Sequence, residues 1–269
     1  MDNQQLITET KNYRKEKVSK KRGLVGGISA VLALCIAIAA FWFLHPHKYG
    51  KWEIIKEATR TENGEIAGKC FCGKKEQRVI YAGSQGLSYE VISKDTCKIS
   101  VIGTCKDSEL VISNFYDGYE VISIREYSFM RCKDFTSLYI PDSVKTIEQG
   151  AFAFCTELRS VDIPDSVTSI DLLAFNACDN LKSVNIGDGV KSIGEQAFSA
   201  CNNLTDLTIG KNVKTIWKGA FENCRNLTSV TYNGTVSEWG KIDKGDYWNN
   251  YTVYCTDGTV FANGQVVYN

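Results

Sequence analysis

The sequence predicts a repeat protein of the α/β class, in which a solenoid of 23-residue coils follows one transmembrane helix. A cysteine column and a phenylalanine column recur every 23 residues, and a fixed period of this length, roughly 20 to 50 residues, is typical of solenoids. Near the amino terminus, residues 23–44 contain no charge over 22 positions. The two columns comprise Cys132, Cys155, Cys178, Cys201 and Cys224, and Phe129, Phe152, Phe175, Phe198 and Phe221.

The amino-terminal region consists of a basic tail, residues 1–22, and the uncharged segment 23–44. A helix needs about 20 apolar residues to cross a bilayer, which the segment supplies. All seven Lys and Arg residues of the first 44 precede this segment, against three Asp and Glu. The positive-inside rule therefore predicts a single-pass signal anchor in the cell membrane, with the tail cytoplasmic and the repeats extracellular.

Two other interpretations of this segment are a cleaved secretory signal, ending after Ala39, and a lipoprotein signal that uses Cys35. The tail is long for a signal peptide, and the apolar run continues through residues 41–44, beyond the cleavage site. A lipoprotein signal normally has a small residue before its cysteine, whereas Leu34 is large. Both observations favour an uncleaved anchor.

Residues 45–80 are expected to form a juxtamembrane linker or a small β module. Cys70 and Cys72 within it supply only half of a tetrahedral zinc site. His45 and His47 could complete such a site, but 22 residues separate His47 from Cys70, which fits no finger spacing. We therefore expect no metal here.

Residues 81–110 are expected to open the repeat domain, 111–227 to form the solenoid and 228–269 to cap it. Cys97 and Cys105 lie eight residues apart in the opening segment, and a disulfide between them stays an open question.

Each repeat unit reads as a strand followed by a short helical turn. Apolar residues alternate at Leu138 and Ile140, so a strand there turns Tyr139 outward, and Pro141 ends it. The apolar residues that follow are spaced by three and four positions, as on one face of a helix; these are Ile147, Ala151, Phe152, Cys155 and Leu158. Stacked units should pair their strands into a parallel sheet.

The repeat resembles the BspA-like leucine-rich-repeat family of bacterial surface proteins. The resemblance rests on IPDSVKTIEQGAFAFC at 140–155, IPDSVTSIDLLAFNAC at 163–178 and IGDGVKSIGEQAFSAC at 186–201, and it extends over residues 87–269. It implies a leucine-rich-repeat solenoid and a surface protein of the adhesin type.

The periodic cysteines are expected to be small, buried core residues. We expect free thiols, because helical segments would separate neighbouring coils by about 8–10 Å, beyond the ~7 Å limit for a disulfide. Aromatic residues near the carboxyl end are expected to cap the last coil; these are Trp217, Trp239, Tyr247, Trp248 and Tyr251.

The outward strand positions form a polar, hydroxyl-rich row that is the candidate interaction face. It could equally be a recognition surface or an inert solvated sheet. The row comprises Tyr139, Asp162, Asn185, Thr208 and Thr231, flanked by Ser137, Ser160, Ser183, Asp206 and Ser229.

The composition argues against several function classes. The two histidines both lie beside the predicted membrane segment, so the repeat domain cannot assemble a Ser-His, Cys-His or multi-His site. After residue 44 the chain has 24 basic and 28 acidic residues (31 − 7 and 31 − 3), which weighs against a nucleic-acid partner. We therefore predict no catalytic residue, no cofactor, no metal and no enzyme activity.

Two functional hypotheses remain. The first is a membrane-anchored cell-surface protein that binds another protein or a glycan through its solenoid, in the manner of an adhesin. The alternative is a non-catalytic scaffold subunit of the cell's own envelope machinery, whose tail 1–22 contacts cytoplasmic proteins or anionic lipid.

Overall fold

The computed structural model describes residues 53–56, 64–69, 75–80, 83–84, 86–101, 107–245 and 250–269. All of these residues belong to one compact unit of the chain, residues 48–269. The basic tail, both histidines and the predicted membrane segment 23–44 lie outside the described residues. Among those that are described, no helix has the length and apolar character needed to span a membrane.

The described residues of segment 45–80 form a three-stranded antiparallel sheet in the order β1-β2-β3. Its strands are β1 (Glu53–Lys56), β2 (Gly64–Lys69) and β3 (Lys75–Ile80). Strands β2 and β3 pair without a break, from Gly64 opposite Ile80 to Lys69 opposite Lys75. These residues therefore form a small β module, while Cys70 and Cys72 lie outside the described residues.

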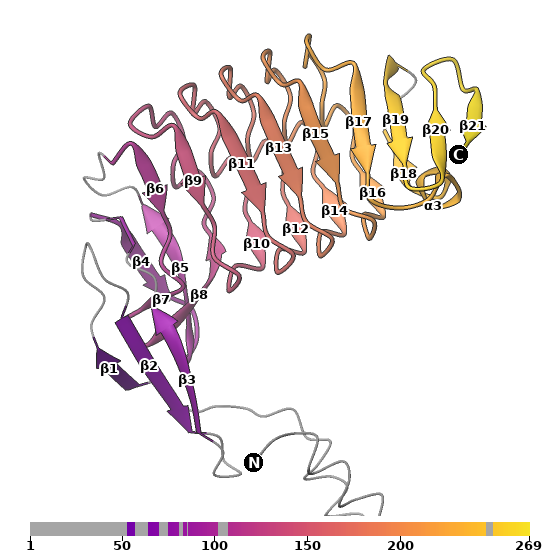
Figure 1. Cartoon of the computed structure of the whole chain (residues 1–269). Coiled ribbons are helices and arrows are strands. Elements are labelled where there is room, and N and C mark those ends of the chain that lie inside the picture. The colour runs from indigo at the N-terminus through magenta and orange to yellow at the C-terminus, as the bar shows by residue number, and fades with distance from the viewer. Residues whose placement is uncertain are drawn as a thin grey trace, which may run out of the picture. The chain divides into compact units, whose positions relative to one another are not determined.

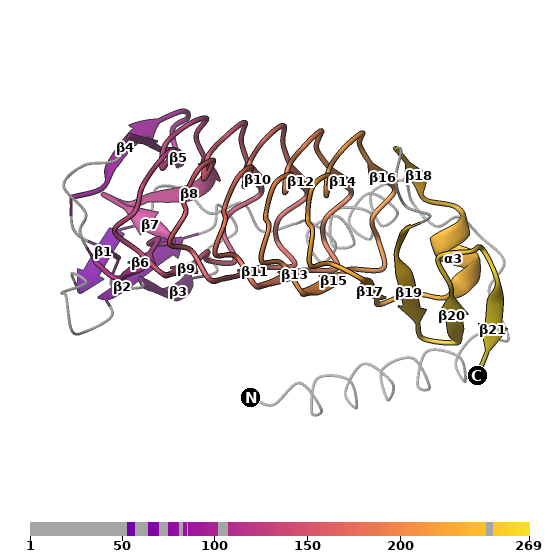
Figure 2. The same cartoon turned by 90° about the horizontal axis from the view of Figure 1, so that it is seen from above.

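The repeat domain is a β-solenoid whose coils contribute to two sheets of nine strands each (Figures 1 and 2). The main sheet runs in the order β21 (Val266–Tyr268), β20 (Gly258–Val260), β19 (Thr252–Cys255), β17 (Ser229–Tyr232), β15 (Asp206–Ile209), β13 (Ser183–Ile186), β11 (Ser160–Ile163), β9 (Ser137–Tyr139) and β6 (Glu109–Val111). The second sheet runs in the order β18 (Asp243–Lys244), β16 (Thr215–Ile216), β14 (Ser192–Ile193), β12 (Ser169–Ile170), β10 (Thr146–Ile147), β8 (Tyr119–Ile124), β5 (Thr96–Val101) and β4 (Ser88–Val91), and β7 (Phe115–Tyr116) pairs with β8.

The main-sheet strands confirm the predicted alternation of buried and exposed residues. In β13, Val184 and Ile186 are buried, whereas Asn185 between them is exposed. Parallel pairing places each residue opposite its equivalent 23 positions later, for example Asp162 opposite Asn185. The strand β11 ends directly before Pro164, which has no N–H to continue the ladder.

The helical turn that the sequence predicts for each unit is wrong. A helix would bond the N–H of Phe152 to the carbonyl four residues earlier, but this N–H donates to Ala174 of the next coil at 2.7 Å. Gly150 and Phe154 adopt positive φ of 59° and 61°, which interrupts a right-handed helix. The apolar residues are spaced by three and four positions here because consecutive turns of the chain each place a side chain in the same core. Among the described residues, the α-helix is α3 (Val236–Gly240).

Coils are as closely spaced on the turn side as on the strand side. The phenylalanine column forms one stack, with ring centroids 5.0 to 5.3 Å apart between neighbouring coils. The expected separation of about 8–10 Å is therefore wrong, because hydrogen bonds between coils replace helix packing. This side of the solenoid is held by backbone bonds and ring stacking together.

The five periodic cysteines are free thiols in the core, which confirms their predicted burial. From the second coil on, each thiol donates to the carbonyl of the phenylalanine in the preceding coil, as Cys155 does to Phe129 at 3.0 Å. Burial raises the pKa of the Cys155 thiol. Cys97 is likewise a buried free thiol, whereas Cys105 lies outside the described residues.

The carboxyl end of the core is closed by α3 and two aromatic side chains. Trp239 of α3 is 5% exposed and packs on Tyr232, whose hydroxyl donates to the Lys211 carbonyl at 2.9 Å. Tyr251 packs against the core and donates to the Phe221 carbonyl at 3.2 Å. The contacts of Trp239 and Tyr251 are those that the predicted capping role requires.

The other three aromatic residues that were predicted to cap this end have different outcomes. Trp217 is 56% exposed, so its predicted capping role is wrong. It lies directly after β16 of the second sheet. Tyr247 and Trp248 lie outside the described residues.

Candidate ligand-binding face

The structure brings the predicted row onto one face of the main sheet, one residue from each of five adjacent strands. Register pairs Asp162 with Asn185, Asn185 with Thr208, and Thr208 with Thr231. Tyr139 lies in the same row on β9, because its neighbour Leu138 pairs with Val161. Four of the five side chains are exposed, and Thr208 is half-buried. We call this row the main-sheet face.

The main-sheet face extends one strand beyond the predicted row. Tyr254 of β19 lies opposite Thr231 and is 51% exposed. Sequence reasoning missed it, although the signal was present, because Tyr254 follows Thr231 by one 23-residue period. Tyrosines therefore stand on both sides of the four polar residues of the row, Tyr139 on β9 and Tyr254 on β19.

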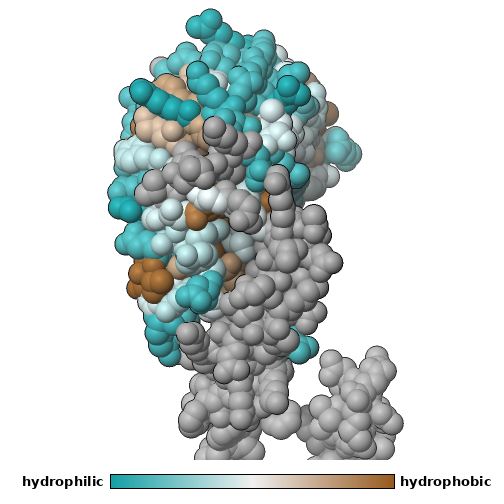
Figure 3. All heavy atoms as spheres, turned by 90° about the vertical axis from the view of Figure 1, so that its left-hand side faces the viewer, coloured by the Kyte–Doolittle hydropathy of each residue, from teal (hydrophilic) through white to brown (hydrophobic). Residues whose placement is uncertain are grey.

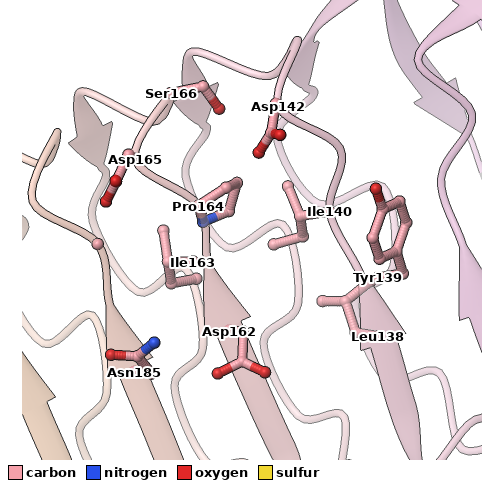
Figure 4. Close-up of a pocket in the computed structure, with 11 residues that line it drawn as sticks. Leu138, Tyr139, Ile140, Asp142, Asp162, Ile163, Pro164, Asp165, Ser166 and Asn185 are labelled. Atoms are coloured by element: carbon pink, nitrogen blue, oxygen red, sulfur yellow. The ribbon is translucent and has the colours of Figure 1, made fainter.

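A groove of about 760 Å³ crosses the amino-terminal half of this face at the ends of β9, β11 and β13 (Figure 4). Tyr139 stands at one side of it, and Asp162 and Asn185 project from the strands. Asp142 and Asp165 come from the loops that follow β9 and β11. The groove thus combines an aromatic ring with carboxylate and amide groups from three successive coils.

The groove is acidic. Among the described residues, Asp142, Asp162 and Asp165 form no ion pair, although Asp165 accepts a hydrogen bond from the Asp188 N–H at 2.7 Å. In the coils that follow, Lys211 pairs with Asp188 at 3.4 Å. Three carboxylates without a cation repel anions, so the groove suits a neutral or a positively charged ligand.

The groove has the elements of a recognition surface. The Tyr139 ring is 38% exposed and offers an apolar surface for stacking, either on a sugar or on a side chain. The carboxylates accept hydrogen bonds from hydroxyl, amide or ammonium groups. In the part of the chain that the structure describes, no group of three or more His, Cys, Asp or Glu side chains is placed to hold a metal ion.

A similar fold occurs in one known structure with a TM-score above 0.5, and a second structure is similar over a comparable part of the chain. A T. pallidum leucine-rich-repeat protein shares 26% identity, with a TM-score of 0.53 over 61% of this chain and 80% of its own. A leucine-rich-repeat protein from Bacteroides ovatus shares 23% identity, with a TM-score of 0.42 over 64% of this chain and 54% of its own. No curated protein is similar to the chain in sequence.

The repeats themselves match a family description. Residues 122–243 match the BspA type leucine rich repeat region in six copies, which spans the coils from β8 to β18. The buried isoleucine, phenylalanine and cysteine columns of these coils are the residues on which the resemblance rests. The repeat region of this chain is therefore a leucine-rich-repeat solenoid of the BspA type.

Proposed function

We propose that the main-sheet face is a non-catalytic binding surface for a protein or a glycan. The observation that supports this proposal is the groove of about 760 Å³, whose walls come from three coils that the 23-residue period places in register. A rigid parallel sheet holds these side chains at fixed spacing, so little conformational entropy is lost when a ligand binds. Extended solenoid surfaces are commonly used in this way.

The chemistry of the face narrows the ligand. An exposed tyrosine beside acceptor groups fits the apolar face and the hydroxyls of a neutral sugar, and it equally fits a Lys or Arg side chain of a protein. An anionic polymer is disfavoured by Asp142, Asp162 and Asp165. The ligand is therefore a neutral glycan or a protein segment of positive charge.

We also propose that residues 23–44 anchor the chain in the cell membrane, with residues 1–22 in the cytoplasm and the solenoid outside. The support is the uncharged run of 22 residues and the seven basic residues before it. Protease treatment of intact cells should then remove the repeats and leave the tail. Protection of the repeats until the cells are lysed would contradict this placement.

Ligand binding is tested with the full chain and a triple substitution, Tyr139→Ala, Asp162→Ala and Asn185→Ala. All three side chains are exposed strand residues, so the fold should persist. The matched control is Lys145→Ala, Lys191→Ala and Lys214→Ala, three exposed residues that precede strands of the second sheet. Both variants and the unchanged chain are applied to glycan arrays and to arrays of extracellular and envelope proteins.

The expected result is a ligand that the unchanged chain and the lysine variant bind and that the main-sheet variant loses by at least about tenfold, or ~1.4 kcal/mol. Equal loss in both variants, or binding that neither variant changes, would remove the main-sheet face from the proposal. A ligand from the cell's own envelope would favour the scaffold role over the adhesin role.

A further inference from the structure

The open edges of the sheets differ in how they are protected. Native sheets guard their edges with charged residues, proline or covering segments, because an unpaired edge can add a strand from another chain. In the described part of the chain, β18 carries Asp243 and Lys244, and β4 carries Glu90. Both outer strands of the β1-β2-β3 sheet also carry charges. The main sheet ends at β6 on one side and at β21 on the other.

The amino-terminal edge of the main sheet is covered. The N–H of Ser84 donates to the carbonyl of Val111 in β6 at 2.8 Å, and the Val111 N–H donates to the Ser84 hydroxyl at 3.0 Å. The same hydroxyl donates to the Glu109 carbonyl at 3.2 Å. Seen from this end, the described surface is largely hydrophilic, with separate hydrophobic patches (Figure 3). The β6 edge has little capacity to accept another strand.

The carboxyl-terminal edge is exposed and uncharged. In β21, Val266, Val267 and Tyr268 are 39%, 47% and 66% exposed. No charged residue occurs in 258–269, which includes both β20 and β21. Among the strands that end the described sheet orders, β21 is thus the one that has neither a charged residue nor a covering segment.

The hydrogen-bond register shows which backbone groups face outward. Asn269 donates to Asp257, and Phe261 donates to Gln265, so these two antiparallel pairs are hydrogen-bonded. Because such pairs alternate, Val267 also bonds inward to Thr259, its register partner. The N–H and C=O groups of Val266 and Tyr268 therefore point to the open side.

We propose that β21 pairs in antiparallel fashion with β21 of a second copy of this chain, about a two-fold axis at Val267. Val266 of each copy then exchanges backbone hydrogen bonds with Tyr268 of the other, and the two Val267 residues face each other as a non-hydrogen-bonded pair. The main sheets of two copies become one continuous sheet. This inference does not depend on the proposed ligand.

A second copy fits the edge better than a partner of other chemistry. The segment 258–269 has no charged side chain with which to recognise a charged partner or to repel a second copy. Its short run of Val, Val and Tyr has high strand propensity and is complementary to itself in antiparallel register. Head-to-tail stacking is blocked because Ser84 covers β6, so assembly closes at two copies.

Pairing through β21 also joins two binding faces. Tyr254 lies opposite Thr259, and Thr259 lies opposite Val267, so all three side chains emerge on the main-sheet face. Across the two-fold axis this face continues into that of the second copy. A ligand with repeated sites would then meet two grooves on one rigid sheet, which raises avidity without a new contact.

The first experiment uses cysteine cross-linking of the full chain. Facing residues of a non-hydrogen-bonded antiparallel pair have Cα atoms about 4.5 Å apart, within the range of a disulfide. Val267→Cys should therefore give a two-chain band on non-reducing gels that reductant abolishes. The matched control is Tyr268→Cys, whose two copies would lie about 8–9 Å apart, too far to bridge.

The cross-linking result decides the register. A two-chain band in Val267→Cys that exceeds the bands of Tyr268→Cys and of the unchanged chain supports the proposal. Equal bands in the two variants, or none in either, would overturn it. The native cysteines are present in all three samples, so any bridge they form contributes equally and cancels.

The second experiment uses light scattering and needs no added cysteine. The unchanged chain should have twice its single-chain mass of 30.0 kDa. Val266→Pro removes an outward-facing N–H and should give the single-chain mass with an unchanged far-ultraviolet circular dichroism spectrum, whereas Val266→Thr should keep the two-chain mass. A single-chain mass for the unchanged protein, or a two-chain mass for Val266→Pro, contradicts the proposal.

Discussion

The buried phenylalanine column and the exposed main-sheet face repeat at the same 23-residue interval but under opposite constraints. The column is phenylalanine in all five coils, each ring stacked on the next at 5.0 to 5.3 Å. The face changes from tyrosine to aspartate, asparagine, threonine and again tyrosine along adjacent strands. Each coil offers the phenylalanine the same close-packed environment, so the same side chain fits in every coil. The exposed positions have no such packing constraint, and their side chains can differ to suit a ligand.

Removing one ring from the stack should produce the largest effect. Phe175 is fully buried between Phe152 and Phe198, so Phe175→Ala should lower the free energy of unfolding by about 3–5 kcal/mol. Asn185→Ala on the exposed face should change it by less than about 0.5 kcal/mol. Urea denaturation followed by circular dichroism measures the free energy of unfolding of both variants. Similar losses in the two variants would show that the buried column and the exposed face are not under opposite constraints.

The thiols of the core should make the solenoid sensitive to alkaline pH. Burial raises the pKa of the Cys97 thiol from 9.0 to about 12. Since the folded chain keeps a proton that the unfolded chain loses, the stabilisation is complete below pH 9 and is lost as the pH rises towards 12.

In this window the unchanged chain should lose stability more steeply than Cys97→Ser, by about 1.4 kcal/mol per pH unit. Serine does not titrate there, and all other groups are common to both chains. Urea denaturation at several pH values provides the slopes, and parallel slopes would show that the Cys97 thiol ionises equally in both states.

A smaller effect concerns the left-handed turns on the same side as the stack. Gln196 has a φ of 53°, at the position that Gly150 and Gly219 occupy in other coils. Gln196→Gly should raise stability by about 0.5–1 kcal/mol, because relief of the unfavourable φ exceeds the entropy cost of glycine. The neighbouring Glu195→Gly has no such relief and should lower the melting temperature; a decrease in both variants would refute the argument.

The smallest effect is expected at a buried hydroxyl next to the groove. The Ser166 hydroxyl oxygen is buried and has no hydrogen-bond partner among the described residues, so Ser166→Ala should leave stability unchanged or raise it by less than about 1 kcal/mol. Ser128 donates to the Arg125 carbonyl at 2.6 Å, and Ser128→Ala should lower stability by about 1 kcal/mol. Thermal melts of the two variants should therefore move in different directions or by clearly different amounts.

Much of the strand side could be predicted from the sequence, but little of the turn side. Alternation at Leu138, Tyr139 and Ile140 has one structural interpretation, and the exposed row follows from it once the period is known. Spacing by three and four residues fits both a helix and a tight series of turns, and only positive φ at residues such as Phe154 distinguishes them. Trp217 was misassigned because composition does not show which way a side chain points.

What the sequence alone determined is the period, the buried columns and the row of outward side chains, because stacked coils require the same residue at the same interval. The tertiary structure decided the turn conformation, the groove across three coils, and the difference between the covered β6 edge and the open β21 edge. The turns and the covered edge depend on hydrogen bonds between residues 22 or more positions apart, and a local pattern of apolar residues carries no information about such bonds.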